Sequence, residues 1–72
     1  MKWDCRGTKE AIENIKNFLA TSKKADKDFI AYKALKEQDR VITALLADED
    51  NDQNSLLTYR RQVRTLLRQV TQ

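Results

Sequence analysis

The sequence predicts an all-α fold, a small three-helix bundle built on an antiparallel α-hairpin with a short N-terminal arm. Three segments carry apolar residues at helical spacing, and short polar runs separate them. No internal repeat, low-complexity tract or linker divides the chain of 72 residues. A chain this short buries only about 60% of its unfolded surface, so we expect one domain with a marginal core.

The first helix is expected over residues 8–21, after an arm of residues 1–7. Gly7 frees the backbone at the polar break, and Thr8 is expected to be the N-cap, accepting a hydrogen bond from an exposed amide. Five apolar residues then fall within about 120° of one another on a helical wheel. They are Ala11, Ile12, Ile15, Phe18 and Leu19.

The second helix is expected over residues 27–47, with Asp26 or Asp28 as its N-cap. Its apolar face spans about 160°, which is wider than contact with one neighbouring helix requires. We therefore expect this helix to be central, with the other two packed against it. The face consists of Ile30, Ala31, Ala34, Leu35, Val41, Ile42, Leu45 and Leu46.

An acidic run follows the second helix and contains no apolar residue larger than alanine. Asp48, Asp50 and Asp52 have the spacing that opens a calcium loop. Gln53 and Tyr59, however, occupy the places where such a loop needs glycine and a bidentate glutamate. We therefore predict a solvated acidic turn close to the arginines that follow it, and no metal site. The turn is long enough for the next helix to fold back antiparallel.

The third helix is expected over residues 54–70. Its apolar residues recur at alternating spacings of three and four, as in a coiled-coil seam. Because Leu57 and Leu67 add apolar surface beside this seam, we expect the chain to cover only part of it and another subunit to cover the rest. The prediction is a homo-oligomer, most simply a dimer. The seam consists of Leu56, Tyr59, Val63, Leu66 and Val70.

The third helix is also basic and rich in arginine. Residues 55–72 hold four arginines and no acidic residue, whereas residues 48–54 hold four acidic residues and no basic one. The arginines lie on one flank beside the seam and suit bidentate contact with carboxylate or phosphate. Three interpretations stay open: binding of an acidic protein surface, binding of nucleic acid or a nucleotide, and pairing with the acidic run or the second helix. The four residues are Arg60, Arg61, Arg64 and Arg68.

Trp3 lies in the predicted arm, two residues before the single cysteine, Cys5. One interpretation is that Trp3 docks onto the bundle and covers apolar surface. The other is that it is an exposed anchor for a partner, since tryptophan is common in binding hot spots.

The composition excludes much of the usual enzyme chemistry. The chain has no histidine, one cysteine and one glycine, which excludes a histidine-based triad, a zinc site of Cys and His, a His-ligated haem and a glycine-rich phosphate loop. The carboxylates lie in charged, exposed segments without apolar neighbours to shift their pKa values. We therefore expect a protein that is not an enzyme and needs no cofactor.

The same composition predicts location. A single thiol suits a reducing compartment, and no uncharged stretch approaches the 18 residues that a membrane span needs. No apolar stretch of signal-peptide type follows the first four residues. We expect a cytoplasmic protein that does not bind membranes.

Residues 36–64 resemble the C-terminal part of the phage tail assembly chaperone family. Arg40 precedes the run Ala44-Leu45-Leu46-Ala47, an acidic Asp48-Glu49-Asp50 follows, and Tyr59-Arg60-Arg61-Gln62-Val63-Arg64 is similar to the family's Tyr-Arg-x-x-Leu-Arg. The resemblance is partial, because Asn51 stands where the family has tryptophan. It implies a non-enzymatic binding role on other phage proteins, in the cytoplasm of the host.

Taken together, these features favour a small protein–protein interaction module, such as a phage or bacterial accessory protein that binds and modulates another protein. The predicted contacts with an acidic partner are the four arginines and Trp3. The alternative is nucleic-acid, nucleotide or anion binding through the arginine flank of the third helix.

Overall fold

The computed structural model describes residues 3–71, and these residues form three α-helices without a strand. Helix α1 spans Cys5–Thr21, α2 spans Lys27–Leu46 and α3 spans Gln53–Thr71. The bundle measures 41 × 21 × 16 Å along its principal axes. The predicted all-α class and the three-helix bundle are therefore confirmed.

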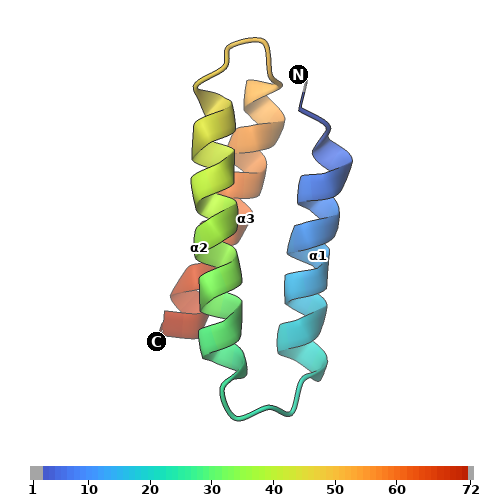
Figure 1. Cartoon of the computed structure of the whole chain (residues 1–72), viewed down its shortest axis with the longest axis vertical. Helices are drawn as coiled ribbons and strands as arrows, with labels where there is room; N and C mark the ends of the chain where they lie inside the picture. Colours follow the sequence, from blue (N-terminus) through green and yellow to red (C-terminus); the bar gives the residue numbers. More distant parts are fainter. Residues whose placement is uncertain (1–2, 72) are drawn as a thin grey trace.

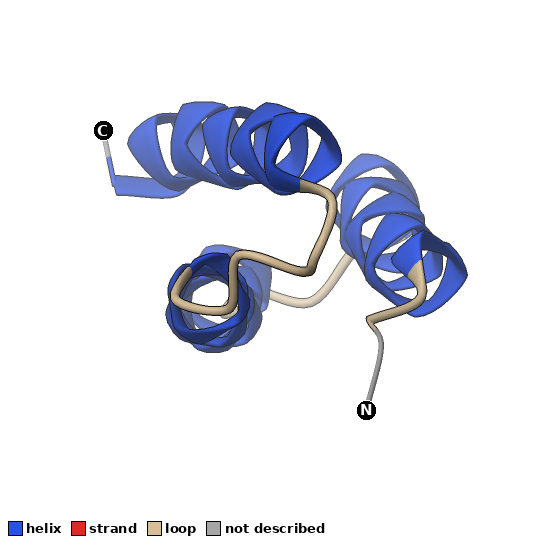
Figure 2. Cartoon of the chain, turned by 90° about the horizontal axis from the view of Figure 1, so that it is seen from above, coloured by secondary structure: helices blue, strands red, loops and turns tan. Residues whose placement is uncertain are grey.

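Helix α2 runs antiparallel to both of its neighbours and holds the bundle together (Figure 1). Its contact with α3 is the most extensive in the structure, and the contact between α1 and α3 is the smallest. Helix α3 crosses α2, so that its C-terminal end lies on the side of α2 away from α1. Figure 2 shows this divergence from above. The prediction that the second helix is central is confirmed.

Helix α1 begins at Cys5, three residues before the predicted start. The N-cap is Asp4, whose Oδ1 accepts a hydrogen bond of 2.9 Å from the backbone amide of Arg6. Thr8 is therefore not the cap, and the prediction of an arm over residues 1–7 is wrong. The described arm consists of Trp3 and Asp4 alone, and residues 1–2 lie outside the described part. Gly7 lies inside α1 without a positive φ, so it does not mark a break in the chain.

Helices α2 and α3 match their predicted ranges to within one residue at each end. Asp26 is the N-cap of α2 by position, but its side chain makes no capping hydrogen bond. At the start of α3, Oδ1 of Asp52 accepts from the amide of Ser55 at 3.2 Å, and Oδ2 accepts from its hydroxyl at 2.8 Å. These hydrogen bonds satisfy an otherwise exposed helical donor. They also lower the pKa of the Asp52 carboxyl.

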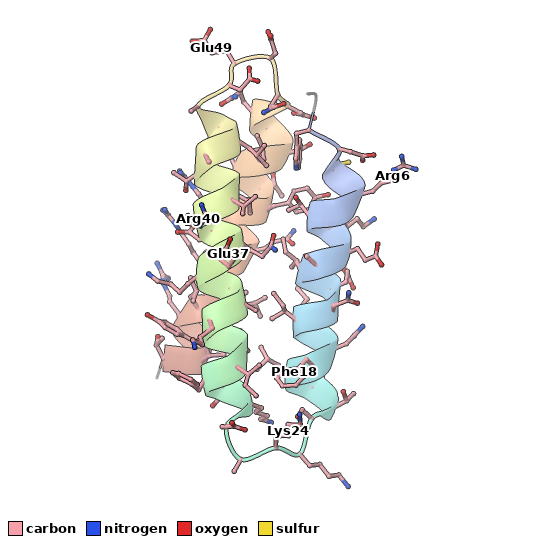
Figure 3. The ribbon with its side chains drawn as sticks, viewed as in Figure 1. Arg6, Phe18, Lys24, Glu37, Arg40 and Glu49 are labelled. Atoms are coloured by element: carbon pink, nitrogen blue, oxygen red, sulfur yellow. The ribbon has the colours of Figure 1, made fainter. Side chains whose placement is uncertain are left out.

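The core combines residues from all three helices. Leu35 and Ile42 of α2 are fully buried, and Ile12 of α1 packs into the same cluster from one side. Figure 3 shows Phe18 of α1 also pointing toward α2. Partly buried apolar side chains surround this cluster, among them Ile15, Leu19, Leu45, Leu46 and Leu67.

The seam predicted to meet another subunit lies instead inside the chain. Leu56 and Val63 are 0% exposed and Leu66 is 9% exposed, while Tyr59 and Val70 are partly buried against the same core. The wide apolar face of α2 accommodates most of the seam, which the prediction assigned in part to a second copy. Leu56, Val63 and Leu66 are therefore covered within the chain and are not available to an oligomer interface, whereas Tyr59 and Val70 keep part of their surface exposed.

Replacing Leu56 by alanine should lower the free energy of unfolding by about 2–5 kcal/mol, because it leaves a cavity in the core. The matched control is Leu57→Ala at the next position. Leu57 is 44% exposed, and its loss should cost less than about 1 kcal/mol. Urea unfolding followed by circular dichroism, at low protein concentration, measures both changes. Equal losses would contradict the placement of Leu56 in the core.

The Asp52 cap predicts a dependence of stability on pH. Because the folded-state pKa lies below the ordinary value, the ionised carboxylate contributes stability fully above the unfolded pKa of about 3.9. This contribution is lost as the pH falls through the lower folded value. Asparagine also caps helices but does not titrate in this range. Below about pH 4 the thermal midpoint of the wild type should therefore fall more steeply than that of Asp52→Asn. Parallel curves would contradict the role of the charged cap.

Candidate functional site

The four arginines of α3 share one surface of the molecule. Together with Leu57 and Thr65 they line a shallow groove along α3, which we call the arginine face. Arg61, Arg64 and Arg68 are exposed and Arg60 is partly buried. Their spacing of three and four residues brings the guanidinium groups to one side of the helix. The predicted grouping of Arg60, Arg61, Arg64 and Arg68 is thus present in the structure.

Only one of these arginines has a carboxylate partner in the described part of the chain. Nε of Arg64 donates to Oδ1 of Asp39 at 3.2 Å, which joins α3 to α2. The Asp39 side chain is 24% exposed and that of Arg64 is 55% exposed. Among residues 3–71, Arg60, Arg61 and Arg68 form no ion pair.

This pattern bears on the interpretation that the arginines balance nearby acidic residues. Pairing with the second helix occurs once, at Asp39, and none of the four arginines pairs with residues 48–52 in the described structure. The predicted proximity of the acidic turn to the arginines does not produce ion pairs. Most of the positive charge of α3 is therefore available to another molecule.

The basic surface continues from α3 onto α2. Asp39 also borders a shallow depression on α2 that contains Lys36 and Arg40, so the ion pair with Arg64 joins the two surfaces. Arg40 pairs with Glu37, and this hydrogen bonding lowers the pKa of the Glu37 carboxyl (Figure 3). The extended surface thus contains carboxylates among its cations, unlike the uniformly basic α3.

The acidic loop, defined as Asp48, Glu49, Asp50 and Asp52, lies at the α2–α3 end of the bundle. Oδ1 of Asp48 accepts from the amide of Asp50 at 3.0 Å, and Asp52 caps α3. Both of these carboxylates are therefore used to fix the loop. In contrast, the exposed carboxylates of Glu49 and Asp50 have no hydrogen-bond or ion-pair partner within residues 3–71, and Glu49 lies at the tip of the loop (Figure 3).

The described residues contain no group of three or more acidic, cysteine or histidine side chains placed to hold a metal ion. None of the helices in this part of the chain is long and apolar enough to cross a membrane. Cys5 is exposed at the first position of α1.

Trp3 docks onto the bundle, so the structure favours the first of its two interpretations. Its Nε1 donates to Oγ1 of Thr8 at 3.0 Å, and its amide donates to Oδ1 of Asn51 at 3.2 Å. The ring meets that of Tyr59 edge to face, with centroids 6.3 Å apart. Trp3 therefore covers core surface and is only partly accessible, and we do not include it in the binding surface.

Asn51 was missed by the sequence interpretation, which placed it in a solvated turn. It is 7% exposed, and its Nδ2 donates to the carbonyl oxygen of Leu45 at 3.0 Å. Together Trp3, Thr8, Asn51 and Tyr59 form a clasp that joins the N-terminal segment to the α2–α3 turn. One signal was present in the sequence: Asn51 is the single uncharged residue between Asp48 and Asp52.

The clasp predicts the effects of two substitutions. Asn51→Ala removes the acceptor of the Trp3 amide and one of the donors to the Leu45 carbonyl, which also accepts from the amide of Asp48, and should cost about 1–3 kcal/mol of stability. The emission of the only tryptophan should shift to longer wavelength as its ring is hydrated. As a control, Tyr59→Phe keeps the ring contact and should change stability by less than about 0.5 kcal/mol. Unchanged emission in Asn51→Ala would contradict the clasp.

Comparison with known proteins adds no assignment to this site. No protein-family model, no curated protein and no solved structure matches the chain.

Proposed function

We propose that this protein is a small non-enzymatic interaction module whose arginine face binds a carboxylate-rich surface of another protein. The observation that carries the proposal is the distribution of partners on α3. Arg64 already binds a carboxylate, that of Asp39, while Arg60, Arg61 and Arg68 have no ion-pair partner in the described structure. One arginine of the face thus already pairs with a carboxylate, and the face presents three further guanidinium groups.

The chemistry of the face supports a protein ligand over nucleic acid. Leu57 is an exposed apolar side chain inside the groove, and protein interfaces combine an apolar centre with an enrichment of arginine. Asp39 and Glu37 are themselves paired, with Arg64 and Arg40, and their charge disfavours a phosphate backbone and an acidic protein alike, so the preference for a protein ligand rests on Leu57. Nucleic-acid or nucleotide binding remains the alternative function and is an outcome of the test below.

The proposal agrees with the resemblance of residues 36–64 to the phage tail assembly chaperones. A phage accessory protein acting in the host cytoplasm would bind and modulate another phage protein without catalysing a reaction. Arg60, Arg61 and Arg64 belong both to the resembling segment and to the arginine face. The phage origin and the cytoplasmic location stay predictions.

The first test measures binding of a fluorescent glutamate-rich peptide by anisotropy. Replacing Arg61 and Arg68 by glutamine should weaken binding by about tenfold, or about 1.4 kcal/mol. The loss should be larger at low ionic strength, where charges are less screened. Lysine at both positions should restore only part of the affinity, because lysine cannot make the bidentate contact.

The matched control is Lys23→Gln with Lys24→Gln, which removes the same charge from the α1–α2 turn, outside the arginine face; Figure 3 shows Lys24 on this turn. This variant should bind the peptide as the wild type does. Equal weakening by both pairs would indicate a general positive field instead of a specific face. Tighter binding of DNA or RNA than of the peptide, with a steep salt dependence, would overturn the proposal in favour of nucleic-acid binding.

A further inference from the structure

We propose that one occupant of the arginine face is the acidic loop of a second copy of this chain. This inference rests on the proposed function, because it names a partner for the same surface. It gives the predicted homo-oligomer an interface different from the apolar seam, which lies inside the chain.

The first argument is charge complementarity. The acidic loop carries four carboxylates, the arginine face carries four guanidinium groups, and the two sets form no ion pair with each other in the described structure. Within the loop, Glu49 and Asp50 have no partner among residues 3–71, as described above. One chain thus presents two exposed surfaces of opposite sign, each with unpaired groups of the kind that the other binds.

The second argument is position along α3. At a rise of about 1.5 Å per residue, Arg60 lies roughly 10 Å and Arg68 roughly 22 Å along the helix from Gln53. The loop lies before Gln53, beyond that end of the helix. A neighbouring copy with the opposite direction would bring its loop alongside the far end of α3.

The third argument is register. Leu57 lies within the arginine face and is one of three exposed large apolar residues in the described structure. If a two-fold axis passes beside Leu57, the two copies of this side chain meet, and every contact occurs twice. Arg64 and Arg68 lie about 10 and 16 Å from Leu57 along the helix. On the other side, Gln53 lies about 6 Å away, and Asp50 is at most roughly 10 Å farther. Arg61, four residues from Leu57, lies about 6 Å along the helix, so this register places Glu49 and Asp50 of each copy opposite the stretch from Arg61 to Arg68 of the other.

Such an interface relies mainly on exposed ion pairs, which are individually weak and sensitive to salt. We therefore expect a dimer with a dissociation constant between about 1 μM and 1 mM at low ionic strength. It should weaken by at least about tenfold when the salt concentration is raised to physiological levels.

The test is a charge-reversal experiment followed by sedimentation equilibrium. The loop variant carries Glu49→Lys and Asp50→Lys, and the face variant carries Arg61→Glu and Arg68→Glu. Asp48 and Asp52 are kept because they fix the loop and cap α3. Each variant alone should dimerise at least about tenfold more weakly than the wild type. An equimolar mixture of the two should restore association, because reversed charges on both sides are again complementary.

The matched control is Glu10→Lys with Glu13→Lys, which makes the same change in net charge on the exposed side of α1. If this variant dimerises more weakly than the wild type, the weakening should be no larger than the added net charge alone produces. Mixed with the face variant, it should associate less than the loop variant does. Glu49→Gln with Asp50→Gln provides a second loop variant, and circular dichroism should show native helicity for all of them.

A wild type that remains monomeric up to about 1 mM at low salt would overturn the inference. Wild-type-like dimerisation by the loop variant, or a mixture that fails to associate, would overturn it as well. The glutamate-rich peptide distinguishes this failure from failure of the proposed function. Peptide binding by a monomeric wild type would leave the arginine face as a site for another protein and reject the second copy as its occupant. Failure of both measurements would reject both proposals.

Discussion

The rest of the structure depends on the width of the apolar face of α2. A narrow face would serve one neighbour, but this face buries Leu35 and Ile42 completely while contacting α1 and α3 together. Helix α3 begins beside α1, crosses α2 and then diverges from α1 (Figures 1 and 2). That crossing sets which side of α3 turns inward. The residues Leu56, Val63 and Leu66 face the core, and the arginines are left at the surface.

The helical fold and the membership of the core were readable from the sequence, because apolar periodicity reports directly which side of a helix is buried. Ile12, Leu35 and Ile42 all came from the predicted faces. How completely the apolar residues of α3 are buried within one chain could not be predicted from the sequence. Whether Leu56 and Val63 meet the same chain or another copy depends on helix crossing, and one helix's periodicity does not encode that crossing.

The start of α1 and the clasp escaped prediction for a different reason. Thr8 is a favourable cap by residue type, yet it accepts a hydrogen bond from Trp3, which precedes it in the chain. Asn51 likewise looks like a turn residue until Trp3 is placed beside it. Both roles depend on side-chain contacts with Trp3, and local residue propensities do not report such contacts. The arginine face itself was found correctly, because it is a property of one helix. Its one ion-pair partner among residues 3–71, Asp39, lies 25 residues from Arg64 in sequence and could be identified only from the structure.

The separation of charge in this chain affects binding more than it affects the stability of the fold. Ion pairs such as Arg64 with Asp39 are exposed and contribute about 0.2–1 kcal/mol. Burial of apolar side chains therefore dominates the folding free energy, and the unpaired charges are available for recognition. The fold thus tolerates changes on the arginine face that would alter binding, so the two properties can be varied separately.

The clasp has a consequence for the order in which the chain folds. The hydrogen bond between Trp3 and Asn51 joins residues 48 positions apart, whereas the contacts of α2 with α3 begin across a turn of only a few residues. Closing a long loop costs more conformational entropy than closing a short one. The α1–α2 and α2–α3 hairpins both close across short turns, so either is able to assemble by local search before the clasp forms. The clasp then closes last, so the environment of Trp3 reports completion of the native state and not the collapse that precedes it.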